Sequence, residues 1–340
     1  MLPRMKTMRR LLCDPRAVRS LAGDCRPSFF SLMPSLSHHA VLAVLQLTRR
    51  RARYRSAAAL HRFIAAQAVL RPQGDAPHAA LLRADLRVER VVDGPHPVLR
   101  VRPAGDREPQ RQLLYLPGGA YINPVVRQHW QLVAQLAQQA DAAVTVPLYP
   151  LAPRHSHRDA LPFVRAQYQR LLDAHGPQAL TLAGDSAGGG LALALAQQLR
   201  DVGLPQPARL LLISPWVDLH LPEGDAELQA LAVRDPMLDL PGLREAARLW
   251  ADGEPLDAPS LSPLHGRLDG LAEMAVFIGT RDLLWPGVRR LRDKAEAAGA
   301  ALHYVEAPGM LHAWPLLPVA EARMARRQML DFIGAPPGGA

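Results

Sequence analysis

Hydrophobic positions recur along this chain in two spacings. From residue 86 onward, short and nearly continuous apolar runs alternate with stretches in which apolar residues return every three or four positions. The runs predict buried strands, and the longer spacing predicts amphipathic helices. The predicted strands are Leu86–Val92, Val98–Val101, Leu113–Leu116, Ala143–Val146, Leu180–Ala183, Leu210–Ser214, Ala275–Gly279 and Leu302–Val305, and the predicted helices are Arg127–Gln139, Ala160–Ala174, Gly189–Val202, Gly287–Ala298 and Ala320–Phe332.

This alternation indicates an α/β fold, with a mostly parallel central sheet covered by helices on both faces. The first two strands are an exception, because a short turn at Asp93-Gly94 predicts a hairpin at a sheet edge. The segment Trp216–Leu264 also departs from the pattern, since it holds helical and loop stretches with several prolines and no predicted strand. We expect it to be an insertion over the carboxyl edge of the sheet.

Two helices are predicted ahead of the first strand. Ser37 can cap a helix over Val41–Arg53, and Ser56 can cap a second helix that ends before Pro72. Helices in this position indicate a lid or cap. The expected organisation is a poorly ordered N-terminal extension (1–32), cap helices (33–75), an α/β core in two pieces (76–215 and 265–333), a cap insertion (216–264) and a flexible tail (334–340).

The composition of the 340 residues is ordinary for a globular protein, with 49% hydrophobic and 21% charged residues. No apolar run is long enough to cross a membrane, and the leucines at 11 and 12 are followed at once by residues that do not fit a signal peptide. We therefore expect a cytoplasmic protein. Cys13 and Cys25 are the only cysteines, and both lie in the N-terminal stretch, so we predict neither a disulfide framework nor a metal site.

The formal net charge of +9 comes mainly from arginine, including a cluster at Arg49–Arg51, Arg53 and Arg55. A nucleic-acid site would combine such charge with aromatic side chains or a recognisable binding fold, and neither is found, so no nucleic-acid partner is predicted. We expect a solvated helix face rich in arginine. Peripheral contact of this basic helix with an anionic membrane is the alternative, and the sequence leaves the oligomeric state open.

Candidate chemistry centres on Gly184-Asp185-Ser186-Ala187-Gly188. This is the Gly-x-Ser-x-Gly pattern, in which a nucleophilic serine is held on a sharp turn between a strand and a helix. The predicted strand before it and the Ala/Leu-rich helix after it supply the required context. Gly184 and Gly188 lack a Cβ, which lets strand and helix pass closely. We predict Ser186 as the nucleophile; the alternative is a glycine-rich turn that only packs a helix on the sheet.

A serine hydroxyl needs a base to take its proton and a third group to orient that base. Asp282 follows the seventh predicted strand and His312 follows the eighth, so both are expected at the same sheet edge as Ser186. Taken singly, Asp282 can be a surface carboxylate or a helix cap, and His312 can be an ordinary loop histidine. The competing base, His303, lies within a strand, and the competing acid, Asp235, lies in the predicted insertion.

The negative charge that develops in such a reaction needs hydrogen-bond donors. The turn after the serine supplies the N–H of Ala187. The loop after the strand Leu113–Leu116 contains glycines that allow backbone N–H groups to approach closely. We predict an oxyanion hole from the N–H of Ala187 and from N–H groups of this loop, which contains Gly118 and Gly119; the alternative is a plain Gly-Gly turn.

These residues resemble the hormone-sensitive-lipase-like branch of the α/β-hydrolases, the "fold-3" esterases. The resemblance runs from about Met33 to Phe332 and implies an α/β-hydrolase fold with a helical cap. It also implies a cofactor-free carboxylic-ester hydrolase that cleaves short to medium acyl esters, with Ser186 as nucleophile, His312 as base and Asp282 as its orienter. The oxyanion hole that the resemblance implies is formed by the N–H groups of Gly119, Ala120 and Ala187. The motifs are Pro117-Gly118-Gly119-Ala120, Tyr149-Pro150-Leu151-Ala152-Pro153, Gly184-Asp185-Ser186-Ala187-Gly188-Gly189, Ser214-Pro215-Trp216-Val217-Asp218, Gly279-Thr280-Arg281-Asp282 and Gly309-Met310-Leu311-His312-Ala313-Trp314.

One position departs from the family. Pro117 stands where the family has histidine, and proline fixes φ and lacks an N–H, so a less preorganised oxyanion loop is expected. A weak or inactive ligand-binding protein on the same fold and an acyltransferase are the alternative functions, although the presence of His312 favours an enzyme. The size of the acyl pocket is expected to depend on Met237, Leu238 and Trp250.

Overall fold

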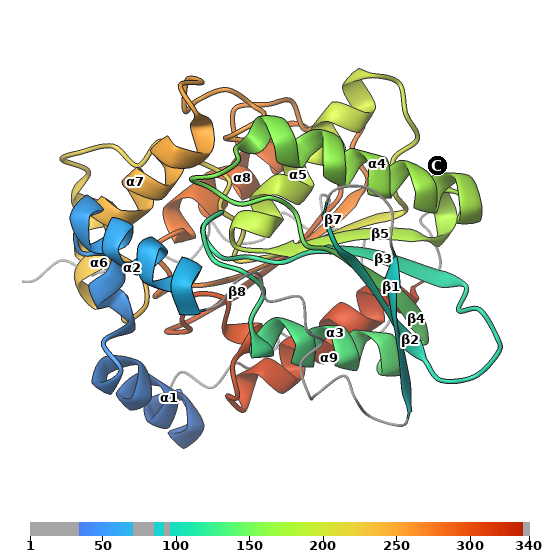
Figure 1. Ribbon diagram of the computed structural model, residues 1–340, viewed down its shortest axis with the longest axis horizontal. Coiled ribbons are helices and arrows are strands. Elements are labelled where there is room, and N and C mark those ends of the chain that lie inside the picture. The colour runs from blue at the N-terminus through green and yellow to red at the C-terminus, as the bar shows by residue number, and fades with distance from the viewer. Residues whose placement is uncertain (1–33, 71–84, 92–95, 336–340) are drawn as a thin grey trace, which may run out of the picture. The chain divides into compact units, whose positions relative to one another are not determined.

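The computed structural model describes residues 34–70, 85–91 and 96–335. The expected N-terminal extension, the Asp93-Gly94 turn and residues 336–340 of the expected tail lie outside the described residues, as do both cysteines. The described strands form a single eight-stranded sheet in the order β1-β2-β4-β3-β5-β6-β7-β8 (Figure 1). They are β1 (Leu86–Val91), β2 (Val98–Pro103), β3 (Arg111–Leu116), β4 (Ala142–Pro147), β5 (Leu180–Asp185), β6 (Arg209–Ile213), β7 (Glu273–Gly279) and β8 (Leu302–Ala307).

The pairing of the strands places the ends of β3, β5, β7 and β8 at one edge. β1 and β2 form the predicted antiparallel pair at the side of the sheet, and β2 also pairs antiparallel with β4. The remaining neighbours are all parallel. Because parallel strands run in the same direction, the loops that follow them meet at the carboxyl edge of the sheet, where ligands of α/β proteins bind.

Helices cover both faces of the sheet, as predicted. In Figure 1, α4 (His157–His175), α5 (Ala187–Asp201) and α8 (Trp285–Ala297) lie on one face, and α3 (Arg127–Gln139) and α9 (Glu321–Gly334) lie on the other. The inner strands are consequently buried along nearly their whole length. This double burial explains why they are continuous apolar runs in the sequence.

The N-terminal helical region is divided differently from the prediction. α1 covers Leu36–Leu47, and a separate 3₁₀ turn, η1, covers Arg50–Tyr54, so the single helix predicted over Val41–Arg53 is wrong. The division falls at Arg49, whose φ of 48° lies in the left-handed region and interrupts a right-handed helix. The arginines of this stretch therefore do not line one continuous helix face.

Of the two caps predicted for the N-terminal helices, the first is wrong and the second is correct. Ser35, not Ser37, caps α1, because its hydroxyl accepts a backbone N–H of the first turn at 3.2 Å. The hydroxyl of Ser37 instead accepts the N–H of Ala320 at 2.9 Å, which ties α1 to the start of α9. Ser56 caps α2 (Ala57–Leu70), because its hydroxyl accepts a first-turn N–H at 3.1 Å. Its predicted role is confirmed.

The segment 216–264, every residue of which is described, holds α6 (Ala226–Arg234) and α7 (Leu240–Ala251) and contains no strand. Both α2 and η1 pack against α7. The imidazole Nε2 of His61 on α2 lies 2.6 Å from a carboxylate oxygen of Glu245 on α7. The N-terminal helices and the inserted helices thus lie together at one end of the sheet (Figure 1).

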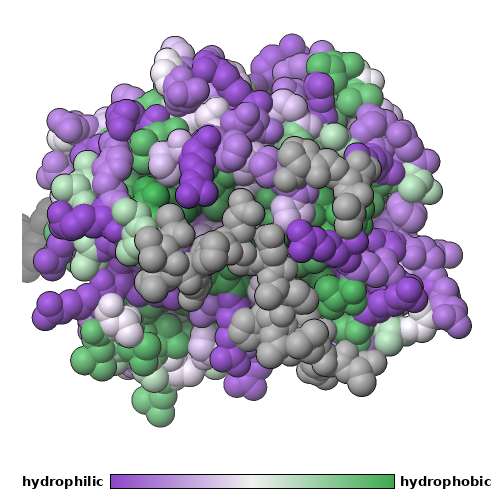
Figure 2. Space-filling model, in the orientation of Figure 1, coloured by the Kyte–Doolittle hydropathy of each residue, from purple (hydrophilic) through white to green (hydrophobic). Residues whose placement is uncertain are grey.

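α1 exposes much of its apolar surface. Leu36, Val44 and Leu47 are 90%, 57% and 82% exposed, and Figure 2 shows hydrophobic side chains gathered where Figure 1 places α1. The helical spacing predicts an apolar side made of Val41, Leu42, Val44, Leu45 and Leu47, and of these Leu45 alone is buried. None of the helices in the described ranges has the length and apolar character needed to span a membrane.

Candidate active site

Ser186 lies at a strained turn between β5 and α5. Its φ of 52° and ψ of −123° fall in a region that residues with a side chain rarely occupy. The surrounding backbone holds this conformation: the N–H of Ser186 donates to the carbonyl of Ile213 at 2.8 Å, and its own carbonyl accepts the N–H groups of Gly190 and Trp216 at 3.0 and 2.8 Å. The turn is therefore fixed from both β6 and α5.

Glycine is required on both sides of this turn. A Cβ on Gly184 would lie 2.4 Å from the carbonyl oxygen of Gly188, and a Cβ on Gly188 would lie 2.0 Å from the carbonyl oxygen of Leu116. Both distances are far below van der Waals contact, and both neighbours are backbone atoms that cannot move aside cheaply. The predicted reason for these two glycines is confirmed.

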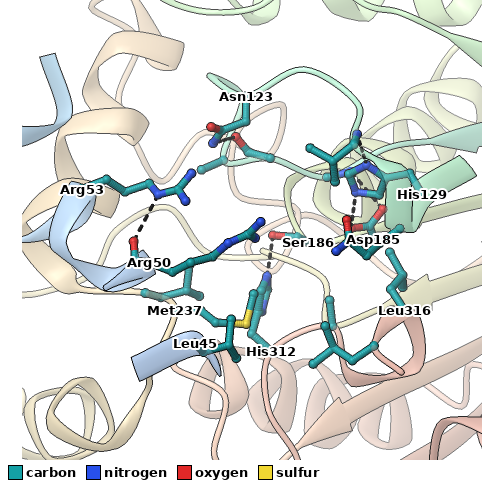
Figure 3. A pocket seen from close by; sticks show the side chains of 18 of the residues that line it. Leu45, Arg50, Arg53, Asn123, His129, Asp185, Ser186, Met237, His312 and Leu316 are labelled. Atoms are coloured by element: carbon teal, nitrogen blue, oxygen red, sulfur yellow. Dashed lines mark hydrogen bonds and ion pairs between the residues drawn. The ribbon is translucent and has the colours of Figure 1, made fainter. Parts of the chain in front are cut away.

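Ser186, His312 and Asp282 form a hydrogen-bonded row, of which Figure 3 shows Ser186 and His312. Nε2 of His312 lies 2.9 Å from Oγ of Ser186, and Nδ1 lies 2.9 and 3.0 Å from the two carboxylate oxygens of Asp282. A carboxylate only accepts, so the Nδ1 proton is held there and the lone pair of Nε2 faces the serine hydroxyl. The structure thus brings these three predicted residues together, while His303 is exposed on β8.

All three residues of the row are buried. Asp282 is 0% exposed, His312 5% and Ser186 8%, which excludes a surface role for Asp282. Its Oδ1 also accepts the N–H of Leu284 at 2.9 Å, so the carboxylate is fixed by the loop that leads into α8. Burial disfavours a charged imidazole, but the charge and hydrogen bond of Asp282 outweigh it and raise the pKa of His312 above its ordinary 6.5.

Asp235, the competing acid in the sequence, has a different position. It is buried, and its Oδ1 accepts the N–H groups of Met237 and Leu238 at 2.7 and 3.0 Å. Its Oδ2 accepts the N–H of Leu283 at 3.0 Å, so it joins the inserted segment to the loop of Asp282. Burial and the nearby charge of Asp282 raise the pKa of Asp235 to about 6.

The loop of His312 is attached to its neighbours by side-chain hydroxyls. Ser214, fully buried at the end of β6, accepts the N–H of Ala313 at 3.0 Å. Thr280, after β7, accepts the N–H of Gly309 at 2.9 Å. Two hydroxyls from adjacent strand ends therefore fix the loop on both sides of the imidazole. Neither residue's role was predicted from the sequence.

Asp185 braces the loop that follows β3. It is 3% exposed; its Oδ1 accepts the hydroxyl of Tyr115 at 2.6 Å and the N–H of Gly118 at 2.9 Å, and its Oδ2 lies 3.3 Å from Nε2 of His129 (Figure 3). Burial opposes ionisation, but His129 and these hydrogen bonds together hold the pKa of Asp185 below its ordinary value. The one sequence signal for this bracing role is the position of Asp185 inside the Gly-x-Ser-x-Gly motif, at the end of a buried strand, where a carboxylate needs hydrogen-bond partners.

The bond to Asp185 changes the interpretation of the predicted oxyanion hole. The N–H of Gly118 is committed to this carboxylate, so Gly118 is a brace of the loop and is removed from the set of free donors. Within the described part of the chain, the N–H groups of Gly119, Ala120 and Ala187 donate to no other residue. These three remain candidates for the oxyanion hole.

The loop is held firmly around Pro117 even though the family histidine is missing. The carbonyl oxygen of Pro117 accepts the hydroxyl of Tyr149 at 2.6 Å. The next residue, Gly118, is fixed by the bond described above, and a Cβ there would lie 2.4 Å from a carboxylate oxygen of Asp185. The expectation of a poorly preorganised loop is therefore not supported by the contacts at this position.

A cavity of about 910 Å³ contains the Ser186 hydroxyl and the His312 imidazole. Met237 and Leu238 line it as expected, whereas Trp250 does not and instead stacks on Tyr121, with ring centroids 4.2 Å apart. Most of the lining is apolar and comes from α1, α2, the insertion and the segment after His312. These apolar residues include Ala40, Val41, Val44, Leu45, Phe63, Ala66, Leu243, Leu284, Leu316 and Leu317.

Part of the predicted arginine cluster lies at the site. Arg50 and Arg53 are half-buried and line the cavity, so these two members of the predicted arginine face border the site. In the described ranges, no cluster of three or more His, Cys, Asp or Glu side chains is arranged to hold a metal ion.

Comparison with known proteins agrees with this geometry. A family model described as the alpha/beta hydrolase fold matches residues 113–316. The chain is similar to an acetyl-hydrolase from Streptomyces hygroscopicus, with 39% identity over 223 residues, which are 64% of this chain and 73% of that protein. It is also similar to the solved structure of an esterase from the bacterial hormone-sensitive lipase family, with 26% identity, a TM-score of 0.76, and coverage of 90% of this chain and 100% of that one.

A solved hormone-sensitive lipase from a metagenome library gives a similar match, with 27% identity, a TM-score of 0.76 and coverage of 90% of this chain and 100% of that one. The chain therefore belongs to the α/β-hydrolase family, in its hormone-sensitive-lipase-like branch, and is a carboxylesterase- or lipase-like hydrolase. The fold, the family and the class of enzyme predicted from the sequence are confirmed.

Proposed function

We propose that the protein hydrolyses carboxylic esters through an acyl-enzyme intermediate on Ser186. The observation that carries this proposal is the 2.9 Å contact between Nε2 of His312 and Oγ of Ser186, with the other ring nitrogen on buried Asp282. As Oγ attacks the carbonyl carbon, Nε2 takes its proton, and the charge of Asp282 stabilises the imidazolium that forms.

The two halves of the reaction use the same groups. The tetrahedral intermediate loses its alcohol as the Nε2 proton moves to the leaving oxygen, and the acyl group stays on Oγ. Water then attacks the acyl carbon and gives a proton to Nε2, which returns it to Oγ as the acid leaves. The N–H groups of Gly119, Ala120 and Ala187 donate to the oxyanion in both halves, and the N-terminal end of α5 adds its positive dipole.

The cavity supports short to medium acyl groups as substrates. Its volume of about 910 Å³ and its apolar lining suit a flexible hydrocarbon chain beside the serine. The same lining supports the expected organisation, in which the N-terminal helices (33–75) and the insertion (216–264) form a cap over the core (76–215 and 265–333). Met237 and Leu238 of the insertion would then set how much of an acyl chain fits.

Hydrolysis of p-nitrophenyl esters from acetate to laurate tests this proposal. We expect the highest kcat/KM at short to medium length and a fall in kcat of about 10⁴-fold or more for Ser186→Ala. Ser260→Ala, at a half-exposed serine away from the cavity, is the matched control and should retain wild-type rates. Equal turnover by wild type and Ser186→Ala would reject Ser186 as the nucleophile.

A further inference from the structure

We propose that the preferred esters carry an anionic oxygen group, such as a carboxylate, on the part of the molecule that faces Arg50 and Arg53. This inference rests on the proposed esterase function and names the class of its substrate. Both arginines belong to η1 and line the cavity that contains Ser186. Figure 3 shows their side chains extending from η1 into the pocket.

Neither arginine has an anionic partner in the described part of the chain. Arg51, which lies between them in η1, pairs with Asp239 at 2.9 Å, whereas no described carboxylate forms an ion pair with Arg50 or Arg53. Three arginines in one turn thus divide into one that anchors η1 to the N-terminus of α7 and two that face the cavity. Arg51, which anchors η1, is paired with a carboxylate, whereas the two arginines that face the cavity are not.

The guanidinium of Arg53 is held in place with its outer edge free. Its Nε donates to the carbonyl oxygen of Arg50 at 3.1 Å, and its Cζ lies 4.4 Å from the ring centre of Phe63. These contacts fix one edge and one face of the planar group. The two terminal nitrogens stay available for the paired hydrogen bonds that guanidinium forms with a carboxylate or a phosphate.

The charges around the cavity leave this cationic pair uncompensated. Among the described lining residues the one carboxylate is Asp185, whose oxygens are already taken by Tyr115, Gly118 and His129. Burial lowers the pKa of Arg53, which reflects poor solvation of its charged form. A cation in apolar surroundings is costly until it is paired, so a bound anion would be stabilised here. The cavity therefore fits a molecule with an apolar portion and one anionic end.

Two matched pairs of esters test the proposal and locate the anion. In the first pair, 4-nitrophenyl hydrogen glutarate carries the charge on the acyl side, and methyl 4-nitrophenyl glutarate is its neutral counterpart. In the second pair, 4-acetoxybenzoate carries the charge on the alcohol side, and its methyl ester is neutral. The measured quantity is the ratio of kcat/KM for the charged ester to that for the neutral ester, in wild type, in Arg50→Gln/Arg53→Gln, and in Arg55→Gln.

We expect wild type to favour the charged member of one pair, and the double variant to lower that ratio about 10- to 100-fold, mainly through KM. Arg55→Gln, at an exposed arginine outside the cavity, should keep the wild-type ratio, and the preference should weaken with added salt. A neutral preference in both pairs, or an unchanged ratio in the double variant, would overturn the proposal.

Binding to an inactive protein separates this proposal from the esterase function. In Ser186→Ala, calorimetry with monomethyl glutarate and with dimethyl glutarate measures recognition without turnover. Tighter binding of the monoanion, lost on adding Arg50→Gln/Arg53→Gln, supports the anion site even if wild type hydrolyses no ester. Equal binding of the two compounds, alongside normal hydrolysis of neutral esters, would reject the anion site and leave the esterase proposal standing.

Discussion

The Asp185→Asn substitution tests how the oxyanion loop is held. The carboxylate accepts three buried donors, at 2.6 Å from Tyr115, 2.9 Å from Gly118 and 3.3 Å from His129. Asparagine keeps one acceptor oxygen for the first two donors but turns an N–H₂ group toward the imidazole. Nδ1 of His129 already accepts the N–H of Val126 at 3.0 Å, so Nε2 carries the proton and would face another donor.

The cost follows from these three contacts. Two charge-assisted hydrogen bonds become neutral, losing about 1 kcal/mol each, and the third is lost with a buried donor unsatisfied, at about 1–3 kcal/mol. The smaller desolvation cost of a neutral amide offsets part of this loss. We expect the free energy of unfolding to fall by about 2–4 kcal/mol and kcat to fall roughly tenfold or more as the loop loosens.

Urea unfolding and hydrolysis of p-nitrophenyl acetate measure the two effects, with Asp106→Asn at an exposed position as the control. Because the folded-state pKa of Asp185 is depressed, its charge stabilises the fold above the unfolded pKa of about 3.9, and that contribution is lost as pH falls further. The stability gap between wild type and Asp185→Asn should therefore be full at pH 7 and shrink below about pH 4. A gap under about 1 kcal/mol at pH 7 together with unchanged kcat would refute the proposed brace.

Three further changes have defined outcomes. Gly188→Ala should prevent accumulation of folded protein, because its Cβ would lie 2.0 Å from the carbonyl of Leu116; a normal thermal transition would contradict this. Pro117→His should hold or raise turnover of p-nitrophenyl acetate, and a large fall would mean that the loop depends on proline. In wild type the raised pKa of His312 should place the acid limb of the kcat/KM–pH profile above pH 6.5. Asp235→Asn removes a negative charge near the imidazole, so it should lower the pKa of His312 and move that limb to lower pH. An unmoved limb would show that Asp235 does not act on His312.

Much of the fold and the reactive row could be predicted because both follow from strand order. Parallel strands that are buried on both faces appear in the sequence as continuous apolar runs, and their carboxyl ends lie at the same edge of the sheet. Ser186, Asp282 and His312 each lie in the segment just after such a run, so their chain positions were enough to bring them together.

Other features depend on contacts that leave no periodic signal. The partners Asp185 and His129 are 56 residues apart, and nothing local marks His129 as the residue that meets the carboxylate. Arg49 adopts the left-handed conformation that divides the first helix from η1, and no glycine or proline marks this break in the sequence. The outward leucines of α1 follow the helical spacing that usually predicts burial, and only the packed structure shows them exposed.

The central claim is that the Ser186 hydroxyl is activated by His312, and covalent labelling tests it most directly. A fluorophosphonate should modify the wild-type protein once, with the added mass located by peptide mass spectrometry on the segment that contains Ser186. Labelling should disappear in Ser186→Ala and slow strongly in His312→Ala. Rapid labelling of Ser186→Ala at another residue, or no labelling of well-folded wild type, would contradict the account.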